Sequence, residues 1–321
     1  MDLTSFASAA TVHILIGKGG VGKTTTTAAF ATACAAQGLR VLIIELENRP
    51  DLGVSFGHEE PLGYDEVHLL DHRTGGSVHA RAISPDDALV EYLNDHGFLR
   101  LTRRLISTGL LDVIAGSIPG LRDVLVLGKI KQIAADNIAD VIVVDAPATG
   151  HAMTFLTSAA GLMDVARSGP VRAQAASVVE MLTDPSRCRV LLVTLAEELP
   201  VSEAIEAAFL VEDKAGVSLG PVIVNQVDIA TPVLHRSSLD AAHDQGITLD
   251  AEFALALDAA AAFQLQRVSI AREQLDRLRH ELPLPVLELP RLLSPAIGSD
   301  EREVLARVLT EEFETMEGLL P

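Results

Sequence analysis

A glycine-rich stretch near the start of the chain carries the residue types that hold a nucleotide's phosphates. Residues 17–24 read Gly-Lys-Gly-Gly-Val-Gly-Lys-Thr and match the pattern G-x-x-x-x-G-K-[ST] at every fixed position. Glycines let the backbone wrap closely around phosphate oxygens, and the exposed N–H groups then face the anion. We expect Lys23 to reach the β- and γ-phosphates and Thr24 to bind Mg²⁺ through its hydroxyl. The predicted nucleotide-binding residues of this loop are Gly17, Lys18, Gly19, Gly20, Val21, Gly22, Lys23, Thr24 and Thr25.

An aspartate at the end of an apolar run completes the predicted magnesium site. Asp145 follows the sequence Val-Ile-Val-Val at 141–144. A carboxylate at the end of a strand beside the phosphate loop would hold Mg²⁺ through a water molecule. The predicted metal-binding residues are therefore Thr24 and Asp145, and Asp145 is also a predicted catalytic residue.

A parallel sheet would bring the loop and the aspartate together. Two apolar runs flank a helical stretch at 24–37, which predicts a strand–helix–strand unit with parallel strands. Runs of valine, isoleucine and leucine without alternation indicate strands covered on both faces by helices. We expect an α/β fold with a mostly parallel sheet flanked by helices. Its predicted strands are 12–16, 40–46, 140–146, 189–195, 221–225 and 284–290.

Two regions interrupt the alternation of strands and helices. Residues 65–83 have the pattern of two short strands around Thr-Gly-Gly, and residues 249–282 have the pattern of a helix. Residues 86–138 and 151–187 also have mainly helical patterns. We expect one domain over residues 1–321, with a helical subdomain contributed mainly by 86–138 and 151–187.

The net charge, the cysteines and the apolar runs indicate which partners and which compartment to expect. The net charge of −19 disfavours a protein that works by neutralising nucleic-acid phosphates or by docking on an anionic membrane. Cys34 and Cys188 lie far apart, which is neither a disulfide framework nor a metal-binding pair. We find no signal-peptide pattern and no run of about 18 apolar residues, so we expect a cytoplasmic protein.

A second lysine sets this phosphate loop apart. With Lys18 directly after the first glycine, the loop resembles the deviant form found in ParA, MinD, the nitrogenase iron protein and the arsenical-pump ATPases. The resemblance implies that two subunits enclose two nucleotides and that Lys18 crosses to the partner's phosphates as a catalytic cation. It also implies a homodimer, or a heterodimer with a related subunit.

Four further segments resemble the ArsA-like family of arsenical-pump and tail-anchored-protein-targeting ATPases. They are DAPATGH (145–151), GSIPGLRDVLVLGKI (116–130), VTLAEELPVSEA (193–204) and VIVNQ (222–226). The resemblance implies a Mg²⁺-dependent ATPase whose nucleotide state opens and closes a helical subdomain that binds an unidentified client or membrane partner.

A third group of residues is expected at the base of the nucleotide. The resemblance places it beside Asn225, Gln226 and Pro290 and favours ATP. Asp228 has the spacing of a guanine-binding aspartate after Asn225, so GTP is an alternative.

Departures from the family pattern keep other functions open. In the first switch segment, ELENRPDLGVSFG (45–57), Glu47 stands where the family has an aspartate that orients the attacking water, and Glu45 is a rival for that role. The longer carboxylate predicts slow hydrolysis, because a misplacement of about 1 Å can cost about a hundredfold in rate. Two alternatives follow: a nucleotide-gated scaffold with weak hydrolysis, or a positioning ATPase similar to ParA or MinD.

Overall fold

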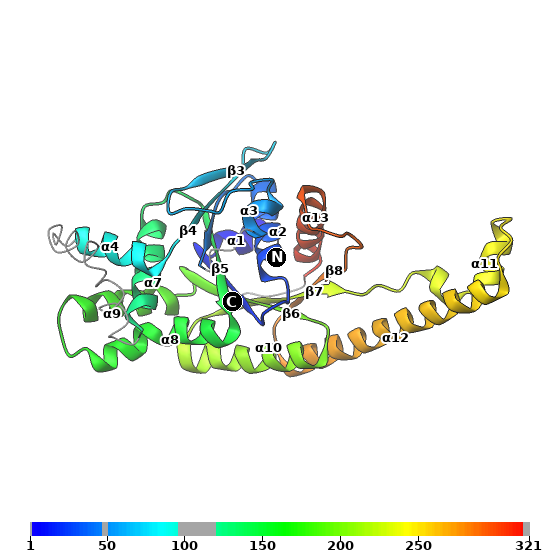
Figure 1. The fold of residues 1–321 in the computed structure, drawn as a ribbon. Coiled ribbons are helices and arrows are strands. Elements are labelled where there is room, and N and C mark those ends of the chain that lie inside the picture. Colours follow the sequence, from blue (N-terminus) through cyan, green and yellow to red (C-terminus); the bar gives the residue numbers. More distant parts are fainter. Residues whose placement is uncertain (1, 47–50, 96–119, 317–321) are drawn as a thin grey trace.

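Parallel strands form the centre of the molecule (Figure 1). The structure is a computed structural model that describes residues 2–46, 51–95 and 120–316 of the 321-residue chain. Within these ranges eight strands form one sheet in the order β3-β4-β2-β5-β1-β6-β7-β8, and only β3 and β4 pair antiparallel. The strands are β1 (Val12–Gly17), β2 (Arg40–Glu45), β3 (Val67–Asp71), β4 (Ser77–Ala82), β5 (Val141–Ala148), β6 (Cys188–Leu195), β7 (Leu219–Val227) and β8 (Val286–Pro290).

Helices cover both faces of the sheet, which explains why the strand sequences are apolar without alternation. All six residues of β1 are buried. Ile14 and Ile16 pack into a core shared with α7 (Leu121–Ala135), α8 (Thr149–Val165), α9 (Pro170–Thr183) and α10 (Glu198–Leu210). Leu15 packs on the opposite face, in a core shared with α1 (Leu3–Ser8), α2 (Lys23–Ala36) and α13 (Ser299–Thr315). The predicted α/β class is confirmed.

A layer of helices lies at one end of the molecule in Figure 1. Within it, α7 packs against α4 (Pro85–Asp95), α8 and α9. The region predicted as helical over 86–138 is described only at its two ends, because residues 96–119 lie outside the described ranges. The inserted subdomain therefore stays a prediction.

An arm extends from the opposite end of the molecule (Figure 1). We define the arm as residues 229–266, which include η2 (Pro232–His235), α11 (Ser238–Asp244) and the first half of α12 (Ala251–Glu281). The 31 residues of α12 span about 46 Å. Asp250 caps this helix by accepting hydrogen bonds from the backbone N–H groups of Glu252 and Phe253. The sequence predicted a helix at 249–282 but not its departure from the body.

The arm differs from the rest of α12 in how little of it is buried. The half of α12 beside the body buries Val268, Ala271, Leu275 and Leu278, whereas only Ala254 is buried in the half that belongs to the arm.

Among the described residues we find no helix that is both long and apolar enough to span a membrane. The remaining described elements are α3 (Asp51–Ser55) and a π-helical turn, η1 (Val211–Ala215).

Candidate functional site

The predicted phosphate loop joins β1 to α2, and two of its glycines lie too close to neighbouring atoms for a side chain. A Cβ atom on Gly17 would lie 2.1 Å from the backbone oxygen of Val193 in β6. Gly22 has a φ of +85°, which side chains disfavour, and a Cβ there would lie 2.2 Å from Nδ2 of Asn225. The loop is therefore held tightly between β1, β6 and β7.

Lys23 lies over this loop. Its side chain is 7% exposed, and its Nζ is 3.5 Å from the backbone oxygen of Lys18. The ammonium group is thus folded back across the loop. It lines a cavity of about 400 Å³ with Gly20, Gly22, Thr24, Thr25, Asp51, Val54, Ser55, Ala296 and Ile297.

The two predicted metal-binding residues are in direct contact. The Thr24 hydroxyl donates a hydrogen bond of 2.7 Å to Oδ2 of Asp145, and Thr27 donates one of 3.4 Å to Oδ1. Asp145 is 7% exposed and stands opposite Leu15 of β1 and Glu45 of β2 in the sheet register. A carboxylate and a hydroxyl are the oxygen donors that Mg²⁺ prefers, so these residues fit the ion. Their role as its ligands stays a prediction.

One cavity is lined by all three residues that we predict to surround the nucleotide base. This cavity of about 620 Å³ includes Thr25, Asn225, Gln226, Pro290 and Arg291 in its wall. It shares Thr25 and Ile297 with the cavity at the phosphate loop. We call it the base cavity. The side-chain amide of Asn225 donates to the backbone oxygen of Val21 at 2.9 Å, so in this structure Asn225 braces the loop.

Asp228, the alternative guanine-binding residue, is engaged within the protein. Its carboxylate accepts hydrogen bonds from Arg291 at 2.8 Å, from Arg267 at 2.9 and 3.2 Å, and from Gln264 at 3.2 Å. Burial opposes its ionisation, but the hydrogen bonds from Arg267, Gln264 and Arg291 prevail and lower the pKa of Asp228. A carboxylate offers about four acceptor positions, and these donors occupy them. This geometry disfavours a role in reading guanine.

Lys18 has a partner within its own chain. Its Nζ lies 2.7 Å from Oε1 of Glu203 on α10, and the two side chains are 34% and 35% exposed. The predicted contact with a second subunit requires this ion pair to open. Sequence reasoning missed Glu203, because a separation of 185 positions between the two partners leaves no local signal.

The predicted water-orienting residue, Glu47, lies outside the described residues. Its rival Glu45 ends β2 and is 1% exposed. Two residues of α3 that sequence reasoning missed, Asp51 and Ser55, line the cavity at the phosphate loop. The available signal was their position in the same switch segment, four and eight residues after Glu47.

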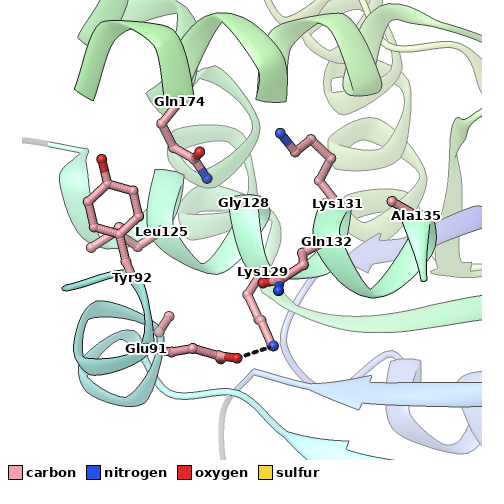
Figure 2. Close-up of a pocket in the computed structure, with 10 residues that line it drawn as sticks. Glu91, Tyr92, Leu125, Gly128, Lys129, Lys131, Gln132, Ala135 and Gln174 are labelled. Atoms are coloured by element: carbon pink, nitrogen blue, oxygen red, sulfur yellow. Dashed lines mark hydrogen bonds and ion pairs between the residues drawn. The ribbon is translucent and has the colours of Figure 1, made fainter. Parts of the chain in front are cut away.

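A separate cavity of about 320 Å³ lies between α4, α7 and α9. Figure 2 shows Lys129 of α7 reaching Glu91 of α4, with 2.6 Å between Nζ and Oε1. Gln174 of α9 lies against Gly128, where a Cβ atom would meet its side-chain nitrogen at 1.9 Å. None of the residues that line this cavity belongs to the phosphate loop.

Comparison with known proteins agrees with this arrangement. The family model described as anion-transporting ATPase matches residues 10–167, which include the phosphate loop and Asp145. ATPase BagA of Mycobacterium tuberculosis is 40% identical over 224 residues, which are 67% of this chain and 64% of that protein. A putative arsenical pump-driving ATPase of Halobacterium salinarum is 27% identical over 228 residues, 65% of this chain and 34% of that protein.

A further relative is similar over a shorter stretch. ATPase GET3 of Blastomyces gilchristii is 28% identical over 146 residues, 44% of this chain and 40% of that protein. The chain thus spans less than two thirds of the length of each of these three relatives.

The loop between a central parallel strand and a helix, with an aspartate on the neighbouring strand, is the P-loop NTPase arrangement. Over residues 10–167 the chain belongs to the ArsA-like family of anion-transporting ATPases.

Proposed function

We propose that this protein hydrolyses ATP to ADP and phosphate at the loop between β1 and α2. The observation that carries the proposal is the contact of 2.7 Å between the Thr24 hydroxyl and Asp145, next to the buried Lys23. These residue types at these positions are the parts that phosphoryl transfer uses. Membership of the ArsA-like family and the names of its relatives support the same conclusion.

The loop would act by binding and neutralising the phosphates. Its backbone N–H groups and the start of α2 present partial positive charge to the anion. Lys23 adds a full positive charge in a site where burial strengthens electrostatic interactions. Thr24 and Asp145 would hold Mg²⁺, which supplies further neutralisation of the phosphate oxygens when it is bound.

We assign the attacking water to the switch segment before α3. Glu47 takes the position of the family's water-orienting aspartate. Its side chain is one methylene longer than aspartate, so a slow reaction fits this residue. Asp51 lines the same cavity as Lys23, so the cavity also holds a carboxylate from the switch segment.

We further propose that two subunits enclose the nucleotides. Lys18 would leave Glu203 and reach the partner's phosphates, in a homodimer or in a heterodimer with a related subunit. The second cation would offset the charge that develops on the phosphates during transfer. Asp145 lies only four residues before α8 begins at Thr149, so a nucleotide at Asp145 has a direct connection to the helical layer. That layer would bind a client or membrane partner whose identity is open.

Two variants and one control test the hydrolysis. Lys23→Ala removes a charged donor, and hydrogen bonds of charged groups contribute about 1.5–3 kcal/mol, so we expect ATP affinity to fall about ten- to hundredfold. Asp145→Asn should keep nucleotide binding but lose phosphate release. Lys214→Ala changes an exposed lysine on η1 and should behave as the unmodified protein. Calorimetric titration and a phosphate-release assay give the two readouts.

The outcomes separate the proposed functions. Unchanged ATP affinity in Lys23→Ala would show that the loop is not the binding site. Tight binding without phosphate release in the unmodified protein would favour a nucleotide-gated binding subunit.

A further inference from the structure

One buried carboxylate connects the base cavity to the arm. Asp228 follows the last residue of β7, and its side chain is 7% exposed. Arg291, which lines the base cavity, donates to Oδ1 at 2.8 Å. Arg267 of α12 donates twice to Oδ2, at 2.9 and 3.2 Å. Two arginines from separate parts of the chain therefore share one negative charge.

The base-cavity side of this network is held in a fixed geometry. Arg291 also donates to Oε1 of Gln226 at 3.0 Å, and both side chains line the base cavity. Gln226 has a φ of +55°, a conformation that residues other than glycine rarely adopt. Such a backbone persists only where its surroundings fix it. A base in this cavity thus meets two side chains that are bound to each other and, through Arg291, to Asp228.

The arm side of the network lies at the last point where α12 is anchored. Gln264 donates to Oδ1 of Asp228 at 3.2 Å, one turn before Arg267. Val268 is the first residue of α12 after Ala254 that is buried. The stretch from 251 to 267 is about 24 Å long, so a tilt of about 10° at this point would move the far end by about 4 Å.

We propose that Asp228 is a positioning residue that couples the base cavity to the direction of the arm. A base that engages Arg291 or Gln226 changes how the two arginines share the carboxylate. Because Gln264 and Arg267 hold α12 through the same carboxylate, the arm then changes its angle to the body. The inference rests on the proposed function, since it requires a nucleotide in the base cavity.

The arm carries large apolar side chains that are exposed to solvent. Phe253, Leu255 and Phe263 of α12 are 56%, 71% and 63% exposed. Exposed apolar side chains of this size are typical of contact surfaces. They lie on more than one side of α12, because residues two apart on a helix face away from each other. A nucleotide that redirects the arm would therefore change where these side chains are presented.

The experiment measures the distance between arm and body with spin labels. Leu255→Cys on the arm and Arg307→Cys on α13 replace exposed residues. The native Cys34 and Cys188 are fully buried, and burial raises the pKa of the Cys188 thiol to about 12, so neither competes for the label. Pulsed electron–electron double resonance is recorded with and without ADP. An excess of unlabelled protein suppresses the signal from pairs of labels in different subunits.

Three variants isolate the network. In the otherwise unmodified protein we expect ADP to shift the distance by about 3 Å, because Leu255 lies about 18 Å from Arg267 along α12. Asp228→Asn and Arg267→Gln should bind ADP with affinity within about threefold of that protein but lose the shift. Asp244→Asn is the matched control, because it breaks the exposed ion pair of 2.6 Å with Arg236 on the arm. It should keep the full shift.

Each outcome decides the inference. An equal shift in Asp228→Asn, or bound ADP without any shift in the unmodified protein, would overturn the coupling and leave the proposed function intact. If ADP does not bind at all, both the proposed function and this inference fail. Should Asp228→Asn not fold, Arg267→Gln decides. The Arg267 side chain is 37% exposed, and its replacement leaves the contact between Arg291 and Asp228 in place.

Discussion

A buried histidine on β1 makes the stability of the whole sheet depend on pH. His13 is fully buried, with its ring 5.3 Å from that of Phe6 and 5.6 Å from that of Phe30. Its Nε2 lies 3.0 Å from the backbone oxygen of Ala7, to which it donates in the neutral form. Its Nδ1 has no partner among the described residues. Burial, with a smaller contribution from the charge of Arg189, lowers the pKa of His13 from 6.5 to about 4.

The lowered pKa fixes the sign and size of the effect. The unfolded chain takes up a proton near pH 6.5, whereas the folded chain does not until about pH 4. Since the unfolded state binds more protons between these values, stability falls as the pH falls through that window. His13 then costs about 1.3 kcal/mol of unfolding free energy between pH 7.5 and pH 5.5, and at most about 3 kcal/mol at lower pH.

A double comparison isolates this histidine from the other nine. His13→Gln is neutral at every pH and can still donate to Ala7. Urea unfolding is followed by circular dichroism at pH 7.5 and 5.5, because the chain has no tryptophan for fluorescence. We expect the unmodified protein to lose about 1.3 kcal/mol more than His13→Gln on acidification. Equal losses in the two proteins would show that His13 is not kept neutral by burial.

Three substitutions at the candidate site give further expected outcomes. Gly22→Ala should lower the melting temperature and weaken ATP binding, because its Cβ would meet Asn225 and its φ is positive; unchanged melting and binding would refute the tight packing of the loop. Glu47→Ala should slow phosphate release at least about tenfold at unchanged ATP affinity, and a rate equal to that of the unmodified protein would remove Glu47 from the mechanism. Glu203→Gln should strengthen nucleotide-dependent dimerisation up to about fivefold in sedimentation velocity, because an exposed ion pair such as that of Lys18 contributes about 0–1 kcal/mol; weaker dimerisation would show that Glu203 supports the interface.

The parts of the site that lie at strand ends could be predicted from the sequence. The phosphate loop and Asp145 follow two apolar runs that became neighbouring parallel strands, β1 and β5. Parallel strands bring their carboxyl ends to one edge of the sheet, so Thr24 and Asp145 had to lie close together. The family resemblance, and not this argument, placed Asn225 and Pro290 beside the base. Both residues line one cavity, and their role in base binding stays a prediction.

Contacts that depend on tertiary packing could not be predicted. The ion pair between Lys18 and Glu203 joins the phosphate loop to a helix that follows β6. The residues around Lys18 do not indicate Glu203 as its partner, and those around Glu203 do not indicate Lys18. Asp228 fitted a guanine-binding spacing, but its three donors come from α12 and from the segment after β8. The part of α12 that belongs to the arm has the composition of an ordinary helix. It differs from the part beside the body only in that almost none of its side chains are buried.

The rate of phosphate release per chain, measured over a range of protein concentrations, tests the account most directly. If two subunits complete each other's sites through Lys18, the rate per chain should rise with concentration to a plateau. Lys18→Ala should then stay near zero at every concentration, while ATP still binds at Lys23. A rate per chain that is independent of concentration and equal in Lys18→Ala would contradict the account.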